Sequence, residues 1–319
     1  MRTKIFGTLG PACHKRPLLE QMIQKGMSGV RLNLSHVSLE DSRDWLEEWQ
    51  AASGGRLDLL VDMQGPEMRI GSLAAKLIFE RNDLVDVPIR NEVVPFLKEG
   101  QEILLDDGKI LARVMQPGEV TRFRMLRDGA LSGGKSIKIP GLANTLPALT
   151  AHDKRNLADA KRFGVTGVMQ PFVRGADDLR QLREALKEAG ASDVKIYAKI
   201  ENRRGIEELE GILEEADWIV IARGDLGNDM NLWELPTAQR TIAAACKAHY
   251  VPFIVVTQML ASMEHSPVPT RAEISDIDHA VCDGAGGVMV TGETAVGDFP
   301  AEVIHYLAHT VEMAEMAIK

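Results

Sequence analysis

Cysteine is scarce in this chain of 319 residues, which has three. Cys13, Cys246 and Cys282 lie far apart and form no CxxC motif, which excludes a disulfide framework and a cysteine-based metal site. We therefore expect a reducing compartment, the cytoplasm. The chain also has no apolar run near the roughly 20 residues that span a bilayer. Its start, "MRTKIFGTLG", has no apolar signal-peptide region, so we expect a soluble protein without a membrane partner.

Basic runs and the common nucleotide-binding motifs are absent too. The chain has no long run of lysine or arginine and a formal net charge of -9, which argues against a nucleic-acid partner. It contains no Walker A motif, no kinase glycine-rich loop and no GxGxxG, so those devices do not hold a nucleotide here. Its hydrophobic content of 45% and charged content of 26% are typical of a globular protein with a sizeable core.

What the chain does have is a series of short apolar runs that alternate with longer amphipathic segments. Most runs are nearly continuous valine, isoleucine and leucine, as in parallel strands covered on both faces. The predicted strands are residues 4–9, 29–35, 57–62, 164–170, 194–200, 218–222, 252–258 and 287–292. The predicted helices are residues 17–26, 40–51, 153–162, 176–189, 205–215, 235–248, 271–283 and 300–317. This alternation predicts an α/β fold, a (β/α)8 TIM barrel; the alternative, a doubly wound open sheet, rarely needs so many units.

The alternation breaks after the third predicted strand. Residues 72–141 contain short strand-like runs separated by turn signals, at residues 84–89, 102–115, 119–126 and 135–141. We expect a barrel domain of residues 1–71 and 142–319, with a small all-β lid domain of residues 72–141 inserted in it. An insertion at this point lies at the carboxyl ends of the barrel strands, where active sites of this fold are built.

Charged residues stand where the barrel strands end. Lys199 and Glu201 are two positions apart at the end of the fifth strand and therefore share a face. Asp225 follows the sixth strand in "IARGDLG", which reads as a glycine-flanked turn. Two carboxylates from neighbouring strand ends suit Mg²⁺, which binds through one or two carboxylates and water. The alternative interpretation is that Lys199 and Glu201 form an ion pair with a purely structural role.

The second, third and seventh strands also end in polar residues. Arg31, Asn33 and Ser35 share one face of the second strand, and a guanidinium beside an amide and a hydroxyl suits a phosphate or carboxylate. Asp62 closes the third strand and could bind a cation or pair with Arg31. Thr257 at the end of the seventh strand carries little weight alone, because threonine is a common strand residue. Together these parts indicate metal-assisted phosphoryl transfer.

Motifs along most of the chain resemble the pyruvate kinase family and occur in that family's order. They are "TLGPA", "GMSGVRLNLSH", "GPEMRIG", "ILLDDGKI", "AKIENRRGIEELEGIL", "IARGDLG", "TQMLASM", "PTRAEISDIDHAVCDGA" and "TGETAVGDFP". The resemblance implies a glycolytic enzyme that transfers phosphoryl from phosphoenolpyruvate to ADP, giving pyruvate and ATP. It also implies dependence on Mg²⁺ or Mn²⁺ and on K⁺, and it leaves a homo-oligomer open.

The resemblance assigns roles to the strand-end residues. Arg31 would hold the transferred phosphate, and Lys199 would stabilise the phosphoryl group and the enolate. Glu201 and Asp225 would bind the divalent metal. Thr257 would lie close to the carbon that is protonated.

Further roles are implied for the neighbouring residues. The substrate carboxylate would meet the backbone of Ala222, Arg223 and Gly224, beside Asp225 and Thr257. The monovalent cation would be bound by Asn33, Ser35, Asp62 and the Met63 carbonyl, with Glu67 nearby. The nucleotide phosphates would meet His36, Arg69 and Lys135.

The sequence departs from the family's usual pattern at three places. We expect the family's C-terminal effector domain to be absent, which removes its allosteric site. The usual "DTKGPEIR" is "DMQGPEMR" here, with Met63 and Gln64, and the loss of the lysine weakens the positive charge beside the site. Val37 and residues 228–233 also differ, near the substrate.

These departures keep other functions open. One is a divergent relative that phosphorylates or cleaves another 2-oxo acid or enolpyruvyl substrate in a biosynthetic pathway. Another is a non-catalytic binding protein that kept the fold. The joint presence of Arg31, Lys199, Glu201 and Asp225 argues against the latter, because each is costly to bury without a use.

Overall fold

The computed structural model describes residues 3–35, 37–106, 108–140 and 146–318. The chain divides into two compact units, one of residues 1–65 and 148–319, the barrel unit, and one of residues 66–147, the inserted unit. The boundaries expected from the sequence, 71/72 and 141/142, each lie six residues inside this insertion, and residues 141 and 142 lie outside the described part of the chain.

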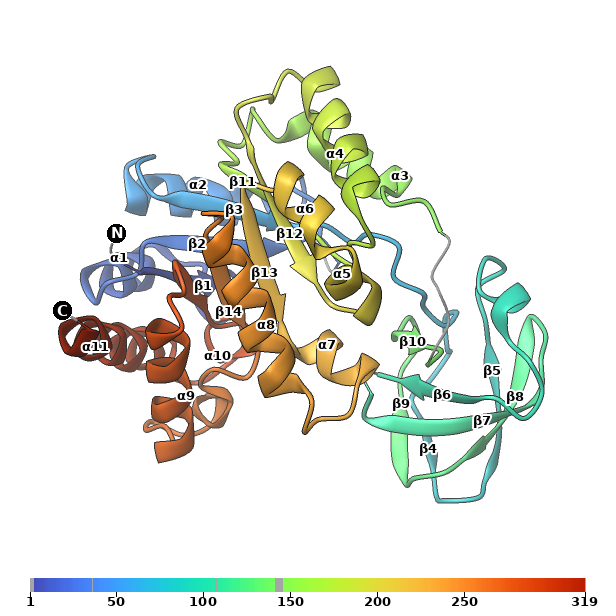
Figure 1. The fold of residues 1–319 in the computed structure, drawn as a ribbon. Helices are drawn as coiled ribbons and strands as arrows, with labels where there is room; N and C mark the ends of the chain where they lie inside the picture. Colours follow the sequence, from blue (N-terminus) through green and yellow to red (C-terminus); the bar gives the residue numbers. More distant parts are fainter. Residues whose placement is uncertain (1–2, 36, 107, 141–145, 319) are drawn as a thin grey trace. The chain divides into compact units, whose positions relative to one another are not determined.

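The barrel unit is the expected (β/α)8 barrel. Within the described residues, parallel strands close a ring in the order β1-β15-β14-β13-β12-β11-β3-β2 (Figure 1). Their bounds are β1 Lys4–Thr8, β2 Gly29–Asn33, β3 Asp58–Asp62, β11 Gly167–Gln170, β12 Lys195–Ile200, β13 Trp218–Ala222, β14 Phe253–Val256 and β15 Gly287–Met289. Each lies within a run that the sequence predicted, because side chains that are apolar on both faces fit a strand covered on both sides.

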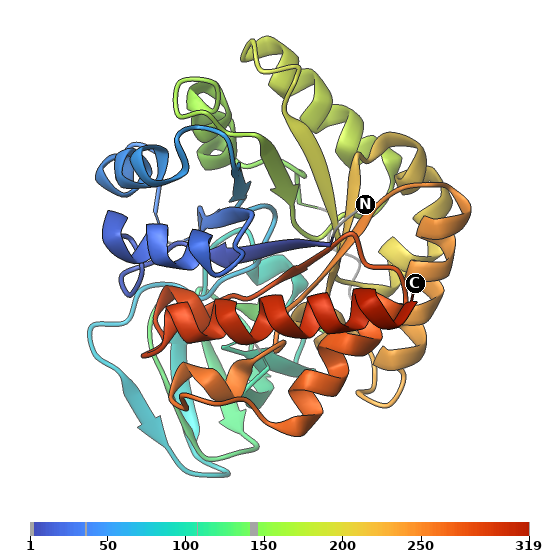
Figure 2. The ribbon, with the colours of Figure 1, turned by 90° about the vertical axis from the view of Figure 1, so that its left-hand side faces the viewer.

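Helices follow the barrel strands and cover the outside of the ring. Their bounds are α1 Arg16–Gln24, α2 Arg43–Ser53, α3 Ala151–Asp159, α4 Ala176–Glu188, α5 Arg203–Glu207, α6 Leu209–Glu215, α7 Arg223–Asp229, α8 Leu235–Ala248, α9 Arg271–Cys282, α10 Gly292–Ala295 and α11 Pro300–Ile318, with a 3-10 turn, η2, at Ala261–Glu264. Figure 2 faces α11, the red helix, which packs against α1 and α9. None of the helices in the described part of the chain combines the length and apolar character that crossing a membrane requires.

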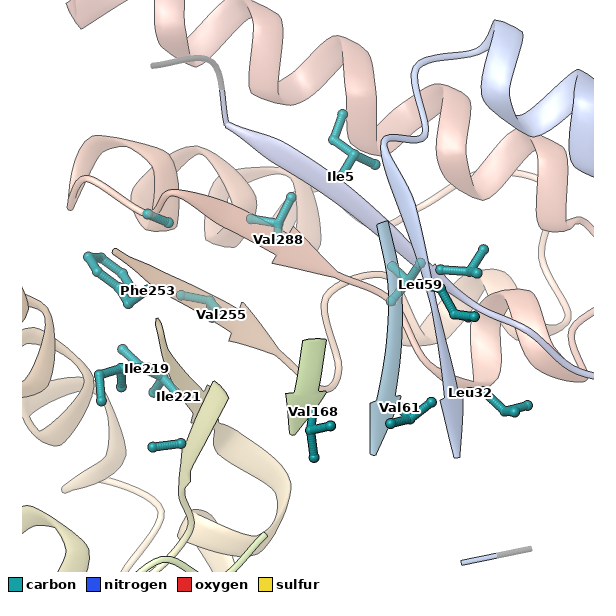
Figure 3. Close-up of a cluster of buried hydrophobic side chains, with 14 of the residues drawn as sticks. Ile5, Leu32, Leu59, Val61, Val168, Ile219, Ile221, Phe253, Val255 and Val288 are labelled. Atoms are coloured by element: carbon teal, nitrogen blue, oxygen red, sulfur yellow. The ribbon is translucent and has the colours of Figure 1, made fainter. Parts of the chain in front are cut away.

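Alternation along the strands divides the core of the barrel unit into two layers. Side chains that point outward, such as Ile5, Val168 and Val255, pack beneath the helices (Figure 3). A separate buried cluster fills the inside of the ring with Phe6, Leu60, Met169, Tyr197, Trp218, Val220, Ala222, Ile254, Val256 and Met289. Tyr197 belongs to this inner layer, so Lys199, two residues later on β12, also faces inward.

The inserted unit is all β. One sheet has the order β10-β6-β7-β8-β5, and β4 pairs with β9 in a second. The bounds are β4 Leu77–Phe79, β5 Leu84–Pro88, β6 Glu102–Leu105, β7 Ile110–Gln116, β8 Val120–Met125, β9 Gly129–Leu131 and β10 Ile137–Lys138, with a 3-10 turn, η1, at Val94–Phe96. Its own apolar core contains Ile103, Val114 and Phe123, each fully buried. The sequence did not predict β4 and β9, which have three residues each and offer little periodicity.

The structure corrects two local predictions in the barrel unit. The segment after β13 is not a turn, because Arg223–Asp229 forms α7 and Asp225 lies in its first turn. Burial of Leu226, which is fully inaccessible, offsets the helix cost of the flanking glycines, about 1 kcal/mol each. The helix predicted at 205–215 begins earlier, at Arg203, and is interrupted at Glu208, whose ψ of 15° leaves helical geometry.

Candidate active site

Charged side chains from β2, β3 and β12 form one buried network at the carboxyl ends of these strands. The Arg31 guanidinium donates to Oδ2 of Asp62 from Nε at 2.9 Å, and its Nη2 lies 2.7 Å from the same oxygen. Lys199 Nζ donates to Oδ1 and Oδ2 of Asp62 at 3.1 and 3.0 Å. Lys199 Nζ also lies 2.9 Å from Oε1 of Glu201, the residue that follows β12. The site therefore pairs two cations with two carboxylates.

Burial makes these charges depend on one another. The exposed fraction of the side chain is 11% for Arg31, 3% for Asp62, 12% for Lys199 and 1% for Glu201. Burial alone would raise the pKa of Asp62, but Lys199 and Arg31 outweigh it and hold that pKa below its usual range. Burial alone would lower the pKa of Lys199, but Asp62 and Glu201 outweigh it and raise that pKa. Asp62 and Lys199 are thus both held in their charged forms.

The pKa of Glu201 shifts in the opposite direction from that of Asp62, because burial outweighs the effect of the neighbouring cation. Burial, with a further contribution from Asp225, raises its pKa to about 7 even though Lys199 opposes the shift. Its Oε2 accepts a hydrogen bond from the Phe172 N–H at 2.8 Å. Its Oε1 lies 2.9 Å from the Lys199 ammonium and, among the described residues, has no other hydrogen-bond donor. A buried carboxylate oxygen with a lone pair left over is the kind of atom that a metal ion can also bind.

The donors at this point fit a divalent cation. Asp225, in the first turn of α7, is close enough to act electrostatically on both Glu201 and Lys199. In the described part of the chain no three His, Cys, Asp or Glu side chains gather as a metal site. Mg²⁺ is commonly held by one or two carboxylates together with water and substrate oxygens, so Glu201 and Asp225 are a sufficient protein contribution.

The ends of β13 and β14 bring together the other residues that were predicted to meet the substrate. Ala222 ends β13, and Arg223 and Gly224 open α7. The Thr257 side chain lies against Gly224, where an added Cβ would come within 2.9 Å of the Thr257 Cγ2. A glycine is therefore required at position 224 for Thr257 to approach the backbone so closely.

The four predicted donors to a monovalent cation lie at the ends of β2 and β3. Asn33 Oδ1 accepts a hydrogen bond from the Ser35 N–H at 3.0 Å, and Met63 is buried. Their oxygen-only chemistry suits a hard cation such as K⁺. The Asp62 carboxylate is shared with Arg31 and Lys199, so K⁺ would add positive charge to a network that is balanced without it.

The predicted nucleotide contacts lie partly in the inserted unit. The Arg69 guanidinium forms an ion pair with Glu67 and donates from Nη1 to the Gly134 carbonyl at 2.9 Å. Lys135 Nζ lies 2.8 Å from Oδ1 of Asp106. Within the described residues the buried Arg69 Nε has no hydrogen-bond partner. The third predicted contact, His36, lies outside the part of the chain that the structure describes.

Comparison with known families agrees with this arrangement. The family described as "Pyruvate kinase, barrel domain" matches residues 1–304. This chain belongs to the pyruvate kinase family. A pyruvate kinase from Bacillus licheniformis is 33% identical over 337 residues, which cover 99% of this chain and 58% of that protein.

More distant organisms carry similar proteins. A pyruvate kinase of Aeropyrum pernix is 35% identical, with 96% of this chain and 69% of that protein covered. Pyruvate kinase 1 of Saccharomyces cerevisiae is 33% identical, with 99% and 68% covered. The chain spans less than three fifths of the length of the Bacillus pyruvate kinase.

Some residues of this pyruvate kinase barrel were not singled out from the sequence. Thr8, at the end of β1, accepts a hydrogen bond from Arg31 Nη1 at 3.3 Å, and the family motif "TLGPA" begins with it. Asp276 pairs with Arg223 from the middle of α9; it lies within the family motif "PTRAEISDIDHAVCDGA", but the motif alone did not indicate its partner. At the departure from the family pattern, the Gln64 and Gly65 N–H groups donate to the Asp153 carboxylate at 2.9 and 3.1 Å. This loop is therefore anchored through its backbone, whatever side chain position 64 carries.

Proposed function

We propose that this chain transfers the phosphoryl group of phosphoenolpyruvate to ADP, giving pyruvate and ATP. The observation that carries the proposal is the buried network of Arg31, Asp62, Lys199 and Glu201, in which Lys199 contacts both carboxylates. A buried, balanced set of charges suits a reaction that moves negative charge between oxygens. Membership of the pyruvate kinase family names the reaction.

The cations of the network are proposed to act on the phosphoryl group. Asp62 holds both the Arg31 guanidinium and the Lys199 ammonium within 3.1 Å, so neither must reorganise when the substrate arrives. Arg31 would bind phosphate oxygens, for which a guanidinium fork is well suited. Lys199 would face the charge that develops on the phosphoryl group and on the enolate. Fixed charges of this kind stabilise a transition state more than mobile water does.

The remaining groups are proposed to bind the substrate and to support the protonation that gives pyruvate. Glu201 and Asp225 would bind Mg²⁺ or Mn²⁺, which neutralises charge on the phosphoryl and enolate oxygens when bound. The substrate carboxylate would meet the backbone at residues 222–224, and Thr257 would lie near the carbon that takes the proton. K⁺ at Asn33, Ser35, Asp62 and Met63, and ADP phosphates at Arg69, Lys135 and His36, remain proposals from the family resemblance.

A coupled assay tests this function. Pyruvate formed from phosphoenolpyruvate and ADP, with Mg²⁺ and K⁺, is followed with lactate dehydrogenase and NADH. We expect Lys199→Met to lower kcat by roughly 100- to 1,000-fold, the usual cost of removing a transition-state charge contact. Lys195→Met is the matched control, because Lys195 begins the same strand and pairs at 3.3 Å with Asp217. It should change kcat by less than about twofold, as is usual for exposed ion pairs.

Binding separates the proposal from its alternative. If the wild type and Lys199→Met were equally inactive while phosphoenolpyruvate still bound with Mn²⁺, pyruvate kinase activity would be excluded. A screen of other 2-oxo acids and enolpyruvyl compounds would then follow. Residues 228–233 would be the first to examine, since Leu232 and Trp233 are 71% and 79% exposed in that segment.

A further inference from the structure

The backbone just after β14 adopts an unusual conformation. Thr257 has a φ of 82° and Gln258 a φ of 55°, so two consecutive residues other than glycine lie in the left-handed region. A β-branched residue such as threonine rarely adopts this conformation. Each such residue costs on the order of 1–3 kcal/mol and persists only where its surroundings enforce it.

The Arg223 side chain holds these two residues in the left-handed conformation. Its Nη2 and Nε donate to the Thr257 carbonyl at 2.8 and 3.2 Å, and Nη2 also donates to the Gln258 carbonyl at 3.2 Å. The guanidinium therefore fixes the carbonyls of both residues that have positive φ. Its side chain is only 11% exposed, so water does not compete strongly for these bonds.

The opposite edge of the same guanidinium is held by α9. Arg223 Nη1 donates to Oδ1 of Asp276 at 2.8 Å and lies 2.6 Å from its Oδ2. A planar guanidinium can meet a carboxylate on one edge and two carbonyls on the other, whereas a lysine ammonium cannot span both. The next residue, Gly224, is the one that the Thr257 side chain touches. Arg223 thus holds Thr257 by its carbonyl while the following residue contacts its side chain.

We propose that Arg223, braced by Asp276, is a positioning residue that sets the direction of the Thr257 hydroxyl. The inference rests on the proposed function, in which Thr257 lies near the carbon that is protonated. In that step the C3 carbon of enolpyruvate gains a proton while its C=C bond becomes single and its enol oxygen becomes the carbonyl. A misdirected Thr257 hydroxyl slows this step and leaves phosphoenolpyruvate binding in place, because binding uses Arg31 and the backbone of residues 222–224 and not the Arg223 guanidinium.

The test compares Arg223→Lys and Asp276→Asn with the wild type. We expect kcat to fall about tenfold or more in Arg223→Lys while KM for phosphoenolpyruvate stays within about threefold. Exchange of the methyl protons of pyruvate with D2O, followed by NMR, should fall by the same factor. Arg183→Lys is the control, since Arg183 meets Asp217 and the Glu215 carbonyl where β13 begins, and it should leave both rates unchanged.

A double-variant cycle distinguishes positioning of Thr257 from general support of the fold. Thr257→Val removes the hydroxyl and keeps a branched side chain beside Gly224. If Arg223 acts through the Thr257 hydroxyl, the variant with both changes should be no slower than Thr257→Val alone, within about twofold. The inference would be overturned if the loss of kcat in the double variant equalled the product of the two single losses. An unchanged exchange rate in Arg223→Lys would also overturn it. A wild type that forms no pyruvate would instead refute the proposed function.

Discussion

Replacing Asp62 with asparagine tests whether the buried network is a single electrostatic unit. Asp62 is 3% exposed and accepts from both Arg31 and Lys199 at distances from 2.7 to 3.1 Å. In Asp62→Asn, Arg31 loses its carboxylate partner and Lys199 keeps only Glu201. The two side chains are only 11% and 12% exposed, so little water is available to replace the lost charge.

The expected cost follows from this count of charges. Removing one partner of a buried ion pair typically costs about 3–5 kcal/mol, so we expect Asp62→Asn to lower the free energy of unfolding by about 4 kcal/mol. Lys199→Met should cost less, about 2 kcal/mol, because Glu201 can then take up a proton and become neutral. The contact between Asp62 and Lys199 is lost in each single variant, so the sum of the two single costs counts it twice. The cost of the double variant should be at least about 1 kcal/mol smaller than the sum of the single costs.

Urea unfolding followed by tryptophan fluorescence measures these values. The four tryptophans, Trp45, Trp49, Trp218 and Trp233, all belong to the barrel unit, so their signal reports that unit and not the inserted one. The metal-free protein is used for every variant, so that no ligand adds to the free energy of unfolding.

A second cycle serves as the control. Asp217 binds Arg183, Lys195 and the Ile196 N–H, and shares none of these partners with Lys199. Asp217→Asn combined with Lys199→Met should therefore be additive within about 0.5 kcal/mol. The same additivity for Asp62→Asn with Lys199→Met would refute the idea that the network is one unit.

Four further predictions concern the site and the residues that support it. Glu201→Gln should weaken Mn²⁺ binding by about tenfold or more in calorimetry; equal affinity would remove Glu201 from the metal site. In the metal-free protein, burial and Asp225 raise the Glu201 pKa from 4.5 to about 7, so the unfolded chain loses this proton first as pH rises. Wild-type stability should thus fall between about pH 4.5 and 7, by on the order of 3 kcal/mol, and Glu201→Gln should remove this fall. Thr150→Ala should lower the free energy of unfolding by about 1 kcal/mol, because Thr150 Oγ1 accepts from the Asp153 N–H in the capping box of α3; an unchanged urea midpoint would contradict this. Replacing K⁺ with tetramethylammonium should lower kcat in the coupled assay, and a constant rate would count against a K⁺ site at Asn33, Ser35, Asp62 and Met63.

Much of the barrel could be predicted from the sequence, because its strands are apolar on both faces and its helices are amphipathic. Each of the eight predicted barrel strands contains an observed one. The segment Arg223–Asp229 was the exception, since its glycines indicate a turn while burial of Leu226 makes it helical. The helix propensity of the segment carries no information about that burial, because the burial depends on helices that are distant in the sequence.

The candidate site could also be predicted only in part from the sequence. Strand periodicity placed Lys199 and Glu201 on one face, and their ion pair at 2.9 Å agrees with it. Pairing of Arg31 with Asp62 was one of two options that the sequence left open, and the structure shows it. The contact between Asp62 and Lys199 was not predicted, because it joins residues 137 positions apart.

The sequence by itself thus determined the alternation of elements, the charged strand ends and the family. Only the tertiary structure decided which charges meet, that one Glu201 oxygen faces the Lys199 ammonium, and that Thr257 is held at a φ of 82° by Arg223. The physical reason is closure of the barrel. A strand's own residues fix which face a side chain occupies, but its partner across the ring depends on the register of all the strands between them.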